Sequence, residues 1–322
     1  MNHLASAFTG KNNAWRYIIM LVAILVVSNT IGSVPLLIPF FKALAGDPSI
    51  AGRIAQNPSD FSPLGVSPYY SLFMMLFPFL ASFIAFMLLV KPLHSRTFIQ
   101  TVNGTAKIRW SHYFISFFVW LALSAIYLFG YIKADPGNFT LSNTSISLLY
   151  VALISVLLIP FQAGLEEIVF RGYLMQGFAV AARNAWLPLL VTSILFALLH
   201  GVNPEVKEYG FMTMMPQYLV FGLIFGLVTL FDDGIEAAMG AHAANNIFLV
   251  IMVTQESSAL QSPALYVQNT IHPWTEFTGL LVSGILFILI LKLIFRWKDF
   301  SIIKQILHRE TPSNTEGHGE FV

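Results

Sequence analysis

The sequence has 322 residues, of which 56% are hydrophobic and only 10% are charged, whereas about 25% of the residues in an average soluble domain are charged. Its 17 Lys and Arg nearly balance its 16 Asp and Glu, and its mean hydropathy is +0.71. These values argue against a soluble enzyme, a disordered chain and a nucleic-acid partner. The chain has no cysteine, which excludes disulfides, thiolate metal sites and a cysteine nucleophile. The composition therefore predicts an integral membrane protein embedded in the lipid bilayer.

Membrane-spanning helices are predicted for eight segments, because each approaches the roughly 20 apolar residues that cross a bilayer. Between residues 145 and 182 the pattern fits either one long helix, kinked near Pro160 or Gly164, or two separate segments. The predicted fold class is therefore all-α, a polytopic membrane protein with about eight transmembrane helices. In chain order the segments are residues 17–42, 68–90, 110–133, 145–162, 185–200, 216–231, 235–254 and 274–295.

The distribution of basic residues predicts the orientation of this bundle, because cytoplasmic loops are enriched in Lys and Arg. When the N-terminus is placed in the cytoplasm, most of the 17 basic residues fall on the cytoplasmic side. The exceptions are Lys42, Arg53, Lys133 and Lys207. Both termini are therefore predicted to be cytoplasmic.

Three polar clusters interrupt the apolar segments, where each ionisable side chain costs about 2.5–3.5 kcal/mol to insert. They are EEIVFR at residues 166–171, FALLH at 196–200 and HAANN at 242–246. Taken singly, each has an ordinary explanation: a Glu–Arg pair can be helix packing, a terminal His can be interfacial, and His-x-x-x-Asn can join two helices. Their occurrence in order, each in an apolar helix, favours a functional site.

Helical spacing gives the two carboxylates of the first cluster different surroundings. Glu167 and Arg171 are four residues apart and can pair on one face of a helix. Glu166 is rotated by about 100° from Glu167 and is left without this partner. The cluster therefore supplies one structural carboxylate and one free carboxylate, and the free one can act as a general base.

The other two clusters supply histidines that can reach the free carboxylate. A helix break is predicted at residues 183–184, and Glu166 and His200 lie 17 residues on either side of residue 183. Two antiparallel helices joined at this break bring Glu166 and His200 to about the same depth. His242 and Asn246 are four residues apart on one helix face, so their side chains can donate two hydrogen bonds to one oxygen. An oxyanion hole requires this arrangement.

In this order the three motifs resemble those of the CPBP family of intramembrane proteases. This family includes the type II CAAX prenyl endopeptidases and the bacteriocin-processing and immunity (Abi) proteins. The resemblance covers roughly residues 145–255 and implies an endopeptidase that hydrolyses a peptide bond of a membrane-associated protein or peptide. It also implies that Glu166 and His200 activate a water, His242 and Asn246 stabilise the oxyanion, and Glu167 and Arg171 support the first helix.

The resemblance also allows a zinc metalloprotease with Glu166, His200 and His242 as ligands, because two His and a Glu suit Zn²⁺. We favour a mechanism without a cofactor, since the amide of Asn246 is a poor zinc ligand but a good oxyanion donor. Two other classes are alternatives: a transporter whose buried polar residues form an ion path, and a non-catalytic immunity protein that acts by binding. Paired repeats of broken helices, typical of many transporters, are not evident in the sequence.

Four regions follow from this interpretation. Residues 1–144 hold the first three transmembrane helices and their loops, and residues 145–255 form a four-helix catalytic core. Residues 256–303 hold the last loop and the final transmembrane helix, and residues 304–322 form a disordered cytoplasmic tail. The compact form is typical of a bacterial member, so the predicted location is the bacterial plasma membrane.

Overall fold

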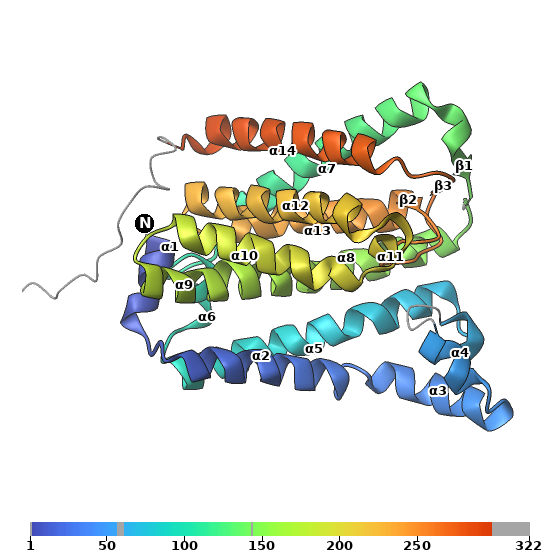
Figure 1. Ribbon diagram of the computed structural model, residues 1–322, viewed down its shortest axis with the longest axis horizontal. Coiled ribbons are helices and arrows are strands. Elements are labelled where there is room, and N and C mark those ends of the chain that lie inside the picture. Colours follow the sequence, from blue (N-terminus) through green and yellow to red (C-terminus); the bar gives the residue numbers. More distant parts are fainter. Residues whose placement is uncertain (1, 57–60, 143, 298–322) are drawn as a thin grey trace, which may run out of the picture.

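The computed structural model describes residues 2–56, 61–142 and 144–297 and consists mainly of long helices (Figure 1). The tail, residues 304–322, lies outside the described residues. The all-α polytopic membrane fold is confirmed, because each predicted segment lies largely within helices. Among the described residues, six helical stretches are long and apolar enough to cross a membrane. They are Ala14–Gly46, Pro68–His94, Trp110–Ala134, Ser147–Ala182, Phe211–Asp232 and Pro273–Phe295.

The remaining two predicted segments form helices that are shorter than a full crossing. They are α10 (Trp186–Leu199) and α13 (Glu236–Met252). The other long elements are α2 (Ala14–Asn29), α3 (Val34–Gly46), α5 (Pro68–His94), α7 (Trp110–Ala134), α8 (Ser147–Glu167), α9 (Met175–Ala182), α12 (Phe211–Asp232) and α14 (Pro273–Phe295). The shorter α-helices and the strands are α1 (Asn2–Ala5), α4 (Ile50–Gln56), α6 (Phe98–Val102), α11 (Pro204–Tyr209), β1 (Phe139–Leu141), β2 (Val253–Thr254) and β3 (Tyr266–Gln268), and short 3-10 helices lie at Ser6–Thr9, Ser62–Leu64, Pro136–Asn138 and His200–Val202.

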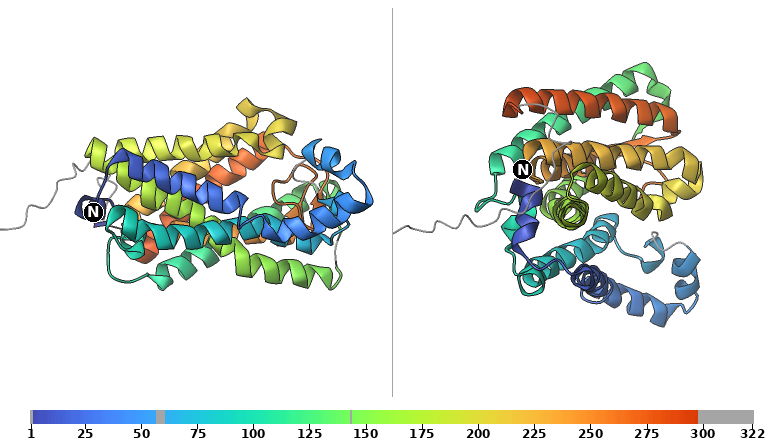
Figure 2. Two further views of the ribbon diagram at one scale, coloured as in Figure 1. Left: turned by 90° about the horizontal axis from the view of Figure 1, so that it is seen from below. Right: turned by 60° about the vertical axis from the view of Figure 1, so that its left-hand side comes forward.

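The helices form three layers. α8, α10, α12 and α13 lie in the middle, with α2 and α5 on one side and α7 and α14 on the other (Figures 1 and 2). α13 contacts both α7 and α8, while α5 contacts α8 and α14 contacts α12. The middle layer corresponds to the predicted four-helix core.

Small residues bring α13 close to α7. Ala237, Ala238 and Ala241 of α13 are fully buried, and a Cβ on Gly240 would lie 2.1 Å from the backbone oxygen of Tyr113 in α7. Only glycine fits at this contact. The close approach fixes the depth of α13 in the bundle, and with it the depth of the polar residues that follow Gly240.

The first predicted segment is not one continuous helix. α2 ends at Asn29 and α3 begins at Val34, within the predicted helix of residues 17–42. Gly32 lies in the intervening turn against α5, where a Cβ would come within 2.7 Å of the Pro78 Cα. Pro35 then occupies the start of α3, a position that favours proline because no backbone donor is lost there.

The structure resolves the two alternatives for residues 145–182 in favour of one continuous helical stretch, Ser147–Ala182. Pro160 and Gly164, the predicted kink positions, lie inside α8. The irregularity begins instead at Ile168, where a π-helix runs from Ile168 to Leu174. Its hydrogen bonding ends with the Met175 N–H donating to the Phe170 carbonyl, five residues earlier. π-helices are rare and are frequently found at functional sites, and this one follows Glu167 directly.

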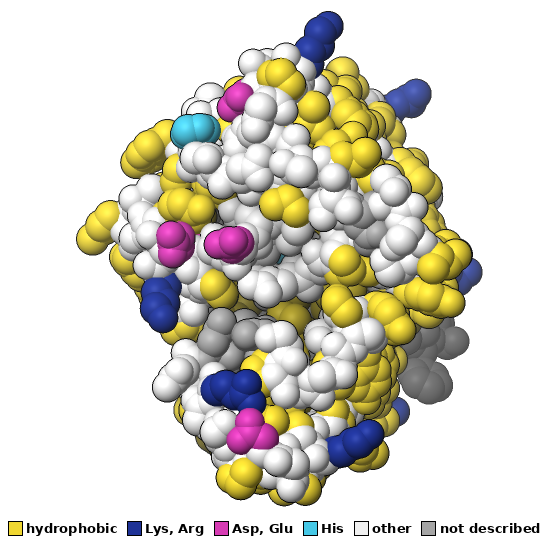
Figure 3. Space-filling view, turned by 90° about the vertical axis from the view of Figure 1, so that its right-hand side faces the viewer, with side chains coloured by type: hydrophobic (Ala, Val, Ile, Leu, Met, Phe, Trp, Pro, Cys, Tyr) yellow, Lys and Arg dark blue, Asp and Glu magenta, His cyan; other side chains and the backbone are white. Residues whose placement is uncertain are grey.

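The two ends of the bundle differ. At one end β3 pairs antiparallel with β1 and parallel with β2; we call the end that carries this small sheet and α11 the loop end. Polar and backbone atoms cover the middle of the loop end, and apolar side chains surround them (Figure 3). On the sides of the helices large apolar residues are exposed, among them Leu88, Ile126 and Leu293. This distribution fits a bundle whose sides contact lipid.

Candidate active site

A cavity of about 640 Å³ is lined by residues from all three layers and extends to the loop end. Glu166, His200 and His242 line its inner part. Gln268 of β3 and Glu276 of α14 line it where it approaches the loop end. The cavity therefore connects the three predicted catalytic side chains with that end of the molecule.

Glu166 lies between two imidazoles. Its Oε2 is 3.9 Å from His200 Nε2 and 3.7 Å from His242 Nε2, so the predicted convergence of Glu166 and His200 across the helix hairpin is confirmed. Within the described part of the chain, Glu166 Oε2 is buried and has no hydrogen-bond partner. These separations are too long for direct hydrogen bonds, but they suit groups bridged by a small molecule.

Both imidazoles are held by their other ring nitrogen. His200 Nδ1 lies 2.8 Å from the Phe196 carbonyl, which can only accept, so this nitrogen carries the proton. His242 Nδ1 lies 2.7 Å from Glu167 Oε1, a carboxylate that also accepts. The Nε2 atoms of His200 and His242 therefore face Glu166, and in a neutral ring each is an acceptor.

Glu167 is the buried structural carboxylate that the spacing predicts. Arg171 Nη1 donates to Glu167 Oε1 over 2.9 Å, and both side chains are fully buried. The Arg171 guanidinium also lies 4.3 Å from the centre of the Phe196 ring, a cation–π contact. The link from Glu167 to His242 was not predicted, because no local spacing relates α8 to α13.

A chain of hydrogen bonds that the motifs do not reveal reaches the other oxygen of Glu166. The Trp120 indole donates to Asn245, which donates to Asn246. Asn246 Nδ2 donates to Gln162 Oε1 over 2.9 Å, and Gln162 Nε2 donates to Glu166 Oε1 over 2.5 Å. The direction is fixed at both ends, because an indole only donates and a carboxylate only accepts. The one sequence signal for Gln162 was its position four residues before Glu166 on the same helix face.

Aromatic rings hold the imidazoles in the cavity wall. The His200 ring stacks on Tyr218, with centroids 4.6 Å apart and an angle of 24° between the planes. The His242 ring stacks on Phe225 at 5.2 Å and 25°. Phe196 packs against both imidazoles. Such stacking restricts each ring to one orientation and leaves its Nε2 edge toward Glu166.

The predicted alternative metal ligands do not form a ready zinc site. Tetrahedral coordination at zinc–ligand distances of about 2.0–2.1 Å places neighbouring ligand atoms about 3.3 Å apart, less than the 3.7 and 3.9 Å observed around Glu166 Oε2. Among the described residues no group of three His, Cys, Asp or Glu is placed to hold a metal ion. These separations do not fit a zinc ion bound by all three side chains, and the choice between the two mechanisms stays a prediction.

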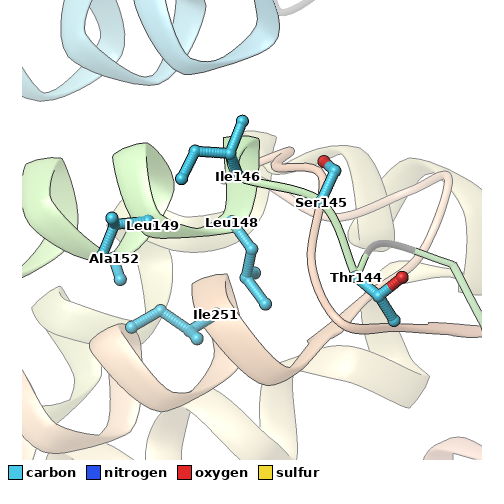
Figure 4. Close-up of a pocket in the computed structure, with 7 residues that line it drawn as sticks. All are labelled: Thr144, Ser145, Ile146, Leu148, Leu149, Ala152 and Ile251. Carbon is cyan, nitrogen blue, oxygen red and sulfur yellow. The ribbon is translucent and has the colours of Figure 1, made fainter.

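A second hollow, of about 510 Å³, lies beside the first turns of α8 and the end of α13 (Figure 4). Its lining is apolar apart from two hydroxyl side chains, and it contains no ionisable group. It therefore offers no acid or base for hydrolysis. The lining residues are Thr144, Ser145, Ile146, Leu148, Leu149, Ala152 and Ile251.

Comparison with known proteins supports the same region of the chain. Residues 144–248 match the family model described as Type II CAAX prenyl endopeptidase Rce1-like. The chain is also similar to "Uncharacterized protein YyaK" of Bacillus subtilis (strain 168), with 27% identity over 289 residues that cover 88% of this chain and 93% of that protein. No solved structure matches it. The matched residues include all three polar clusters.

Proposed function

We propose that this chain, whose residues 144–248 match the Type II CAAX prenyl endopeptidase Rce1-like family model, is a CPBP intramembrane protease, an endopeptidase acting on a membrane-associated peptide or protein. The convergence of Glu166 Oε2 with the Nε2 atoms of His200 and His242 in one cavity carries this proposal. A carboxylate and imidazoles so placed can move protons to and from a water, and their side chains are largely buried.

In the first step a water donates its two hydrogens to Glu166 Oε2 and to Nε2 of a neutral His200. Its oxygen lone pair then faces the substrate and attacks the carbonyl carbon of the scissile bond. Glu166 takes one proton as the new C–O bond forms. The His200 Nδ1 contact with the Phe196 carbonyl supports this role, because it leaves Nε2 as an acceptor.

The oxyanion that forms receives hydrogen bonds from His242 and Asn246. Asn246 Nδ2 has two hydrogens, of which Gln162 accepts one, so the second is available. His242 donates from Nδ1 to Glu167 and can donate from Nε2 as well only as an imidazolium. When the tetrahedral intermediate collapses, the C–N bond breaks and Glu166 returns its proton to the leaving nitrogen.

The buried charges support this protonation state. Glu166 and Glu167 contribute two negative charges, and Arg171 and a protonated His242 contribute two positive ones. A buried cluster with balanced charges costs much less free energy than one with an unpaired carboxylate. His200 remains neutral in this scheme and is free to accept.

Replacement of Glu166 by Gln tests the proposal. Glu166→Gln keeps the shape of the side chain, so it should leave thermal stability nearly unchanged while lowering cleavage by about 10²–10⁴-fold, the contribution of a general base. The assay is mass-spectrometric detection of new termini in a library of N-acylated peptides incubated with the full chain in nanodiscs. Glu256→Gln, an exposed loop carboxylate outside the cavity, controls for the loss of charge. Equal cleavage by Glu166→Gln and the unmodified chain would remove Glu166 from the mechanism.

Chelation separates this mechanism from the zinc alternative. With a Glu/His-activated water, activity persists after exhaustive treatment with EDTA and 1,10-phenanthroline, and the purified chain holds far less than one equivalent of zinc. Stoichiometric zinc that is lost together with activity in His200→Ala would establish the metalloprotease instead.

We also infer that both termini face the cytoplasm of a bacterium and that the cavity opens outward. The N-terminus and the end of α14 lie at the same end of the molecule (Figure 1), which carries most of the basic residues. The loop end carries Lys42, Arg53, Lys133 and Lys207, the basic residues that the orientation rule assigns to the outside. Because the chain has no cysteine, the variants Ser49→Cys and Ser95→Cys can each be treated with an impermeant maleimide added outside intact cells. Only Ser49→Cys should react.

A further inference from the structure

The cavity that holds Glu166 carries negative charge along its length. Its walls contain three carboxylates, those of Glu166, Glu205 and Glu276, whereas no Lys or Arg of the described chain lines it. Lys133 and Lys207, in adjoining segments of the loop end, are exposed and lie outside the lining. Several negatively charged carboxylates inside a partly apolar cavity attract cations more strongly than the same groups on an open surface.

Glu205 of α11 is linked to the imidazole of His200 through Tyr218. Its Oε1 accepts hydrogen bonds from the Tyr218 hydroxyl and from Asn203 Nδ2, and the Tyr218 ring stacks on His200. The other oxygen, Oε2, is buried and has no hydrogen-bond partner within the described residues. A buried carboxylate oxygen without a donor is unfavourable, so this atom is suited to a donor that a substrate brings.

Glu276 places a further carboxylate nearer the loop end. It lies in the first turn of α14 and accepts from the Tyr127 hydroxyl over 2.9 Å and from Gln268 over 3.1 Å. Both of its oxygens have partners. Glu276 therefore contributes mainly charge, whereas Glu205 contributes charge and an unused acceptor.

We propose that the cavity selects a basic peptide segment, with a Lys or Arg side chain next to the scissile bond bound by Glu205. An ammonium or guanidinium would supply the donor that Glu205 Oε2 lacks, in a charge-assisted hydrogen bond. A substrate whose free C-terminal carboxylate lies close to the scissile bond would instead face three carboxylates and no Lys or Arg side chain of the described chain. The placement of this Lys or Arg next to the scissile bond rests on the proposed function. The preference for a basic segment concerns binding alone and can be measured without cleavage.

Binding of two matched peptides tests this preference without cleavage. The probes are a fluorescein-labelled, N-acylated ten-residue peptide of Ala and Leu with one central Lys, and a twin with norleucine at that position. They are titrated by anisotropy against the full chain in phosphatidylcholine nanodiscs, in a Glu166→Gln background so that hydrolysis does not disturb the titration. We expect the Lys peptide to bind about tenfold more tightly than its twin.

Substitutions at two positions of α11, Glu205 and Glu208, test whether the preference depends on Glu205. Glu205→Gln should reduce the ratio of the two dissociation constants to about threefold or less, while Glu208→Gln, an exposed residue of the same helix outside the cavity, should leave it near tenfold. Glu205→Lys should reverse the preference toward a peptide with a central Glu. If Glu205→Gln fails to fold, Glu276→Gln should lower the ratio by a smaller factor.

The proposal is overturned by equal binding of the two peptides in the starting protein, or by a tenfold ratio that survives both Glu205→Gln and Glu276→Gln. These outcomes differ from a failure of the proposed function. In that case the chain with Glu166 intact cleaves no peptide of the library, yet the Lys peptide still binds more tightly than its norleucine twin.

Discussion

His242 Nδ1 lies 2.7 Å from Glu167 Oε1, so the carboxylate that neutralises Arg171 also orients the imidazole facing Glu166. One oxygen atom therefore joins the support of α8 to the chemistry of α13. This dual contact gives Glu167 a larger role than its pairing with Arg171 alone predicts. Loss of Glu167 should affect both the stability of the fold and the rate of hydrolysis.

Glu167→Ala is expected to destabilise the chain by about 3–5 kcal/mol, because it leaves Arg171 buried without a partner. Unfolding in mixed micelles, followed by circular dichroism against denaturant, measures this loss. The double variant Glu167→Leu/Arg171→Leu should recover most of the stability, since replacing both members of a buried pair by apolar residues is often neutral. It should still be inactive, because His242 has lost its acceptor. A Glu167→Ala protein as stable as the unmodified chain would contradict the structural role.

Removal of either proposed oxyanion donor, Asn246 or His242, should slow catalysis and leave substrate binding nearly unchanged. Removal of one such donor typically lowers kcat by about 10²–10³-fold, so Asn246→Ala and His242→Ala should each lower kcat and kcat/KM by similar factors with KM nearly constant. The double variant should lose less than the product of the single losses, because both donors serve one oxygen. Steady-state kinetics on all three proteins measures this. A near-normal kcat for Asn246→Ala would exclude its role as an oxyanion donor.

Gln162 should behave as a positioning residue. It holds Glu166 Oε1 and Asn246 Nδ2 through its two amide atoms, so Gln162→Leu leaves both partners free to rotate. We expect kcat to fall by about tenfold, roughly the 1.4 kcal/mol that one hydrogen bond contributes, while KM changes little. Gln162→Glu is expected to be worse than Gln162→Leu, because it places a carboxylate against that of Glu166. Gln261→Leu, on an exposed part of the last loop, provides the control, and equal kinetics for Gln162→Leu and this control would refute the assignment.

His3, at the end of the bundle opposite the loop end, makes stability depend on pH. Its Nε2 donates to the Arg171 carbonyl over 3.0 Å and its Nδ1 accepts from Gln176, which requires a neutral ring. Burial lowers the pKa of His3 below its ordinary value, and this effect outweighs the opposing contact with the Arg171 carbonyl and the charges of Asp233 and Glu236. The stability that His3 contributes is therefore fully present above about pH 6.5, the pKa in the unfolded chain, and is lost as the pH falls through that value.

His3→Gln keeps a donor for the Arg171 carbonyl and removes the titration. Melting temperatures measured between pH 7.5 and pH 5.0 should fall more for the unmodified chain than for His3→Gln. Other histidines contribute equally to both proteins, so the difference isolates His3. Parallel curves for the two proteins would show that His3 does not titrate in this range.

Spacing within a helix, or across one helix hairpin, predicted much of the site. The pairing of Glu167 with Arg171 follows from a separation of four residues, and the approach of His200 to Glu166 follows from equal arms of a hairpin. Contacts between helices that are distant in the chain were not predictable in this way. The bond from Asn246 to Gln162 and that from His242 to Glu167 depend on how deeply α13 lies against α7 and α8, which Gly240 sets by its contact with Tyr113.

The helices themselves were predicted from apolar runs, but their interruptions were not. The break after Asn29 depends on the contact of Gly32 with Pro78 in another helix. The π-helix carries no proline, and the contact of Gly172 with the Thr101 carbonyl joins residues 71 positions apart in the sequence. The division of the chain into four regions and the catalytic roles of the site residues stay predictions.

The π-helix also affects how many residues its segment can hold. A π-turn takes up one residue more than an α-turn by widening, so deletion of one residue between Ile168 and Leu174 that restores α-helical hydrogen bonding would leave α9 facing nearly the same way. Gln176 would then keep its bonds to His3 and Gln100. Deletion of one residue within the regular part of α8 would instead turn everything beyond it by about 100°. Two adjoining parts of one helical stretch therefore differ in the change of residue count that they tolerate.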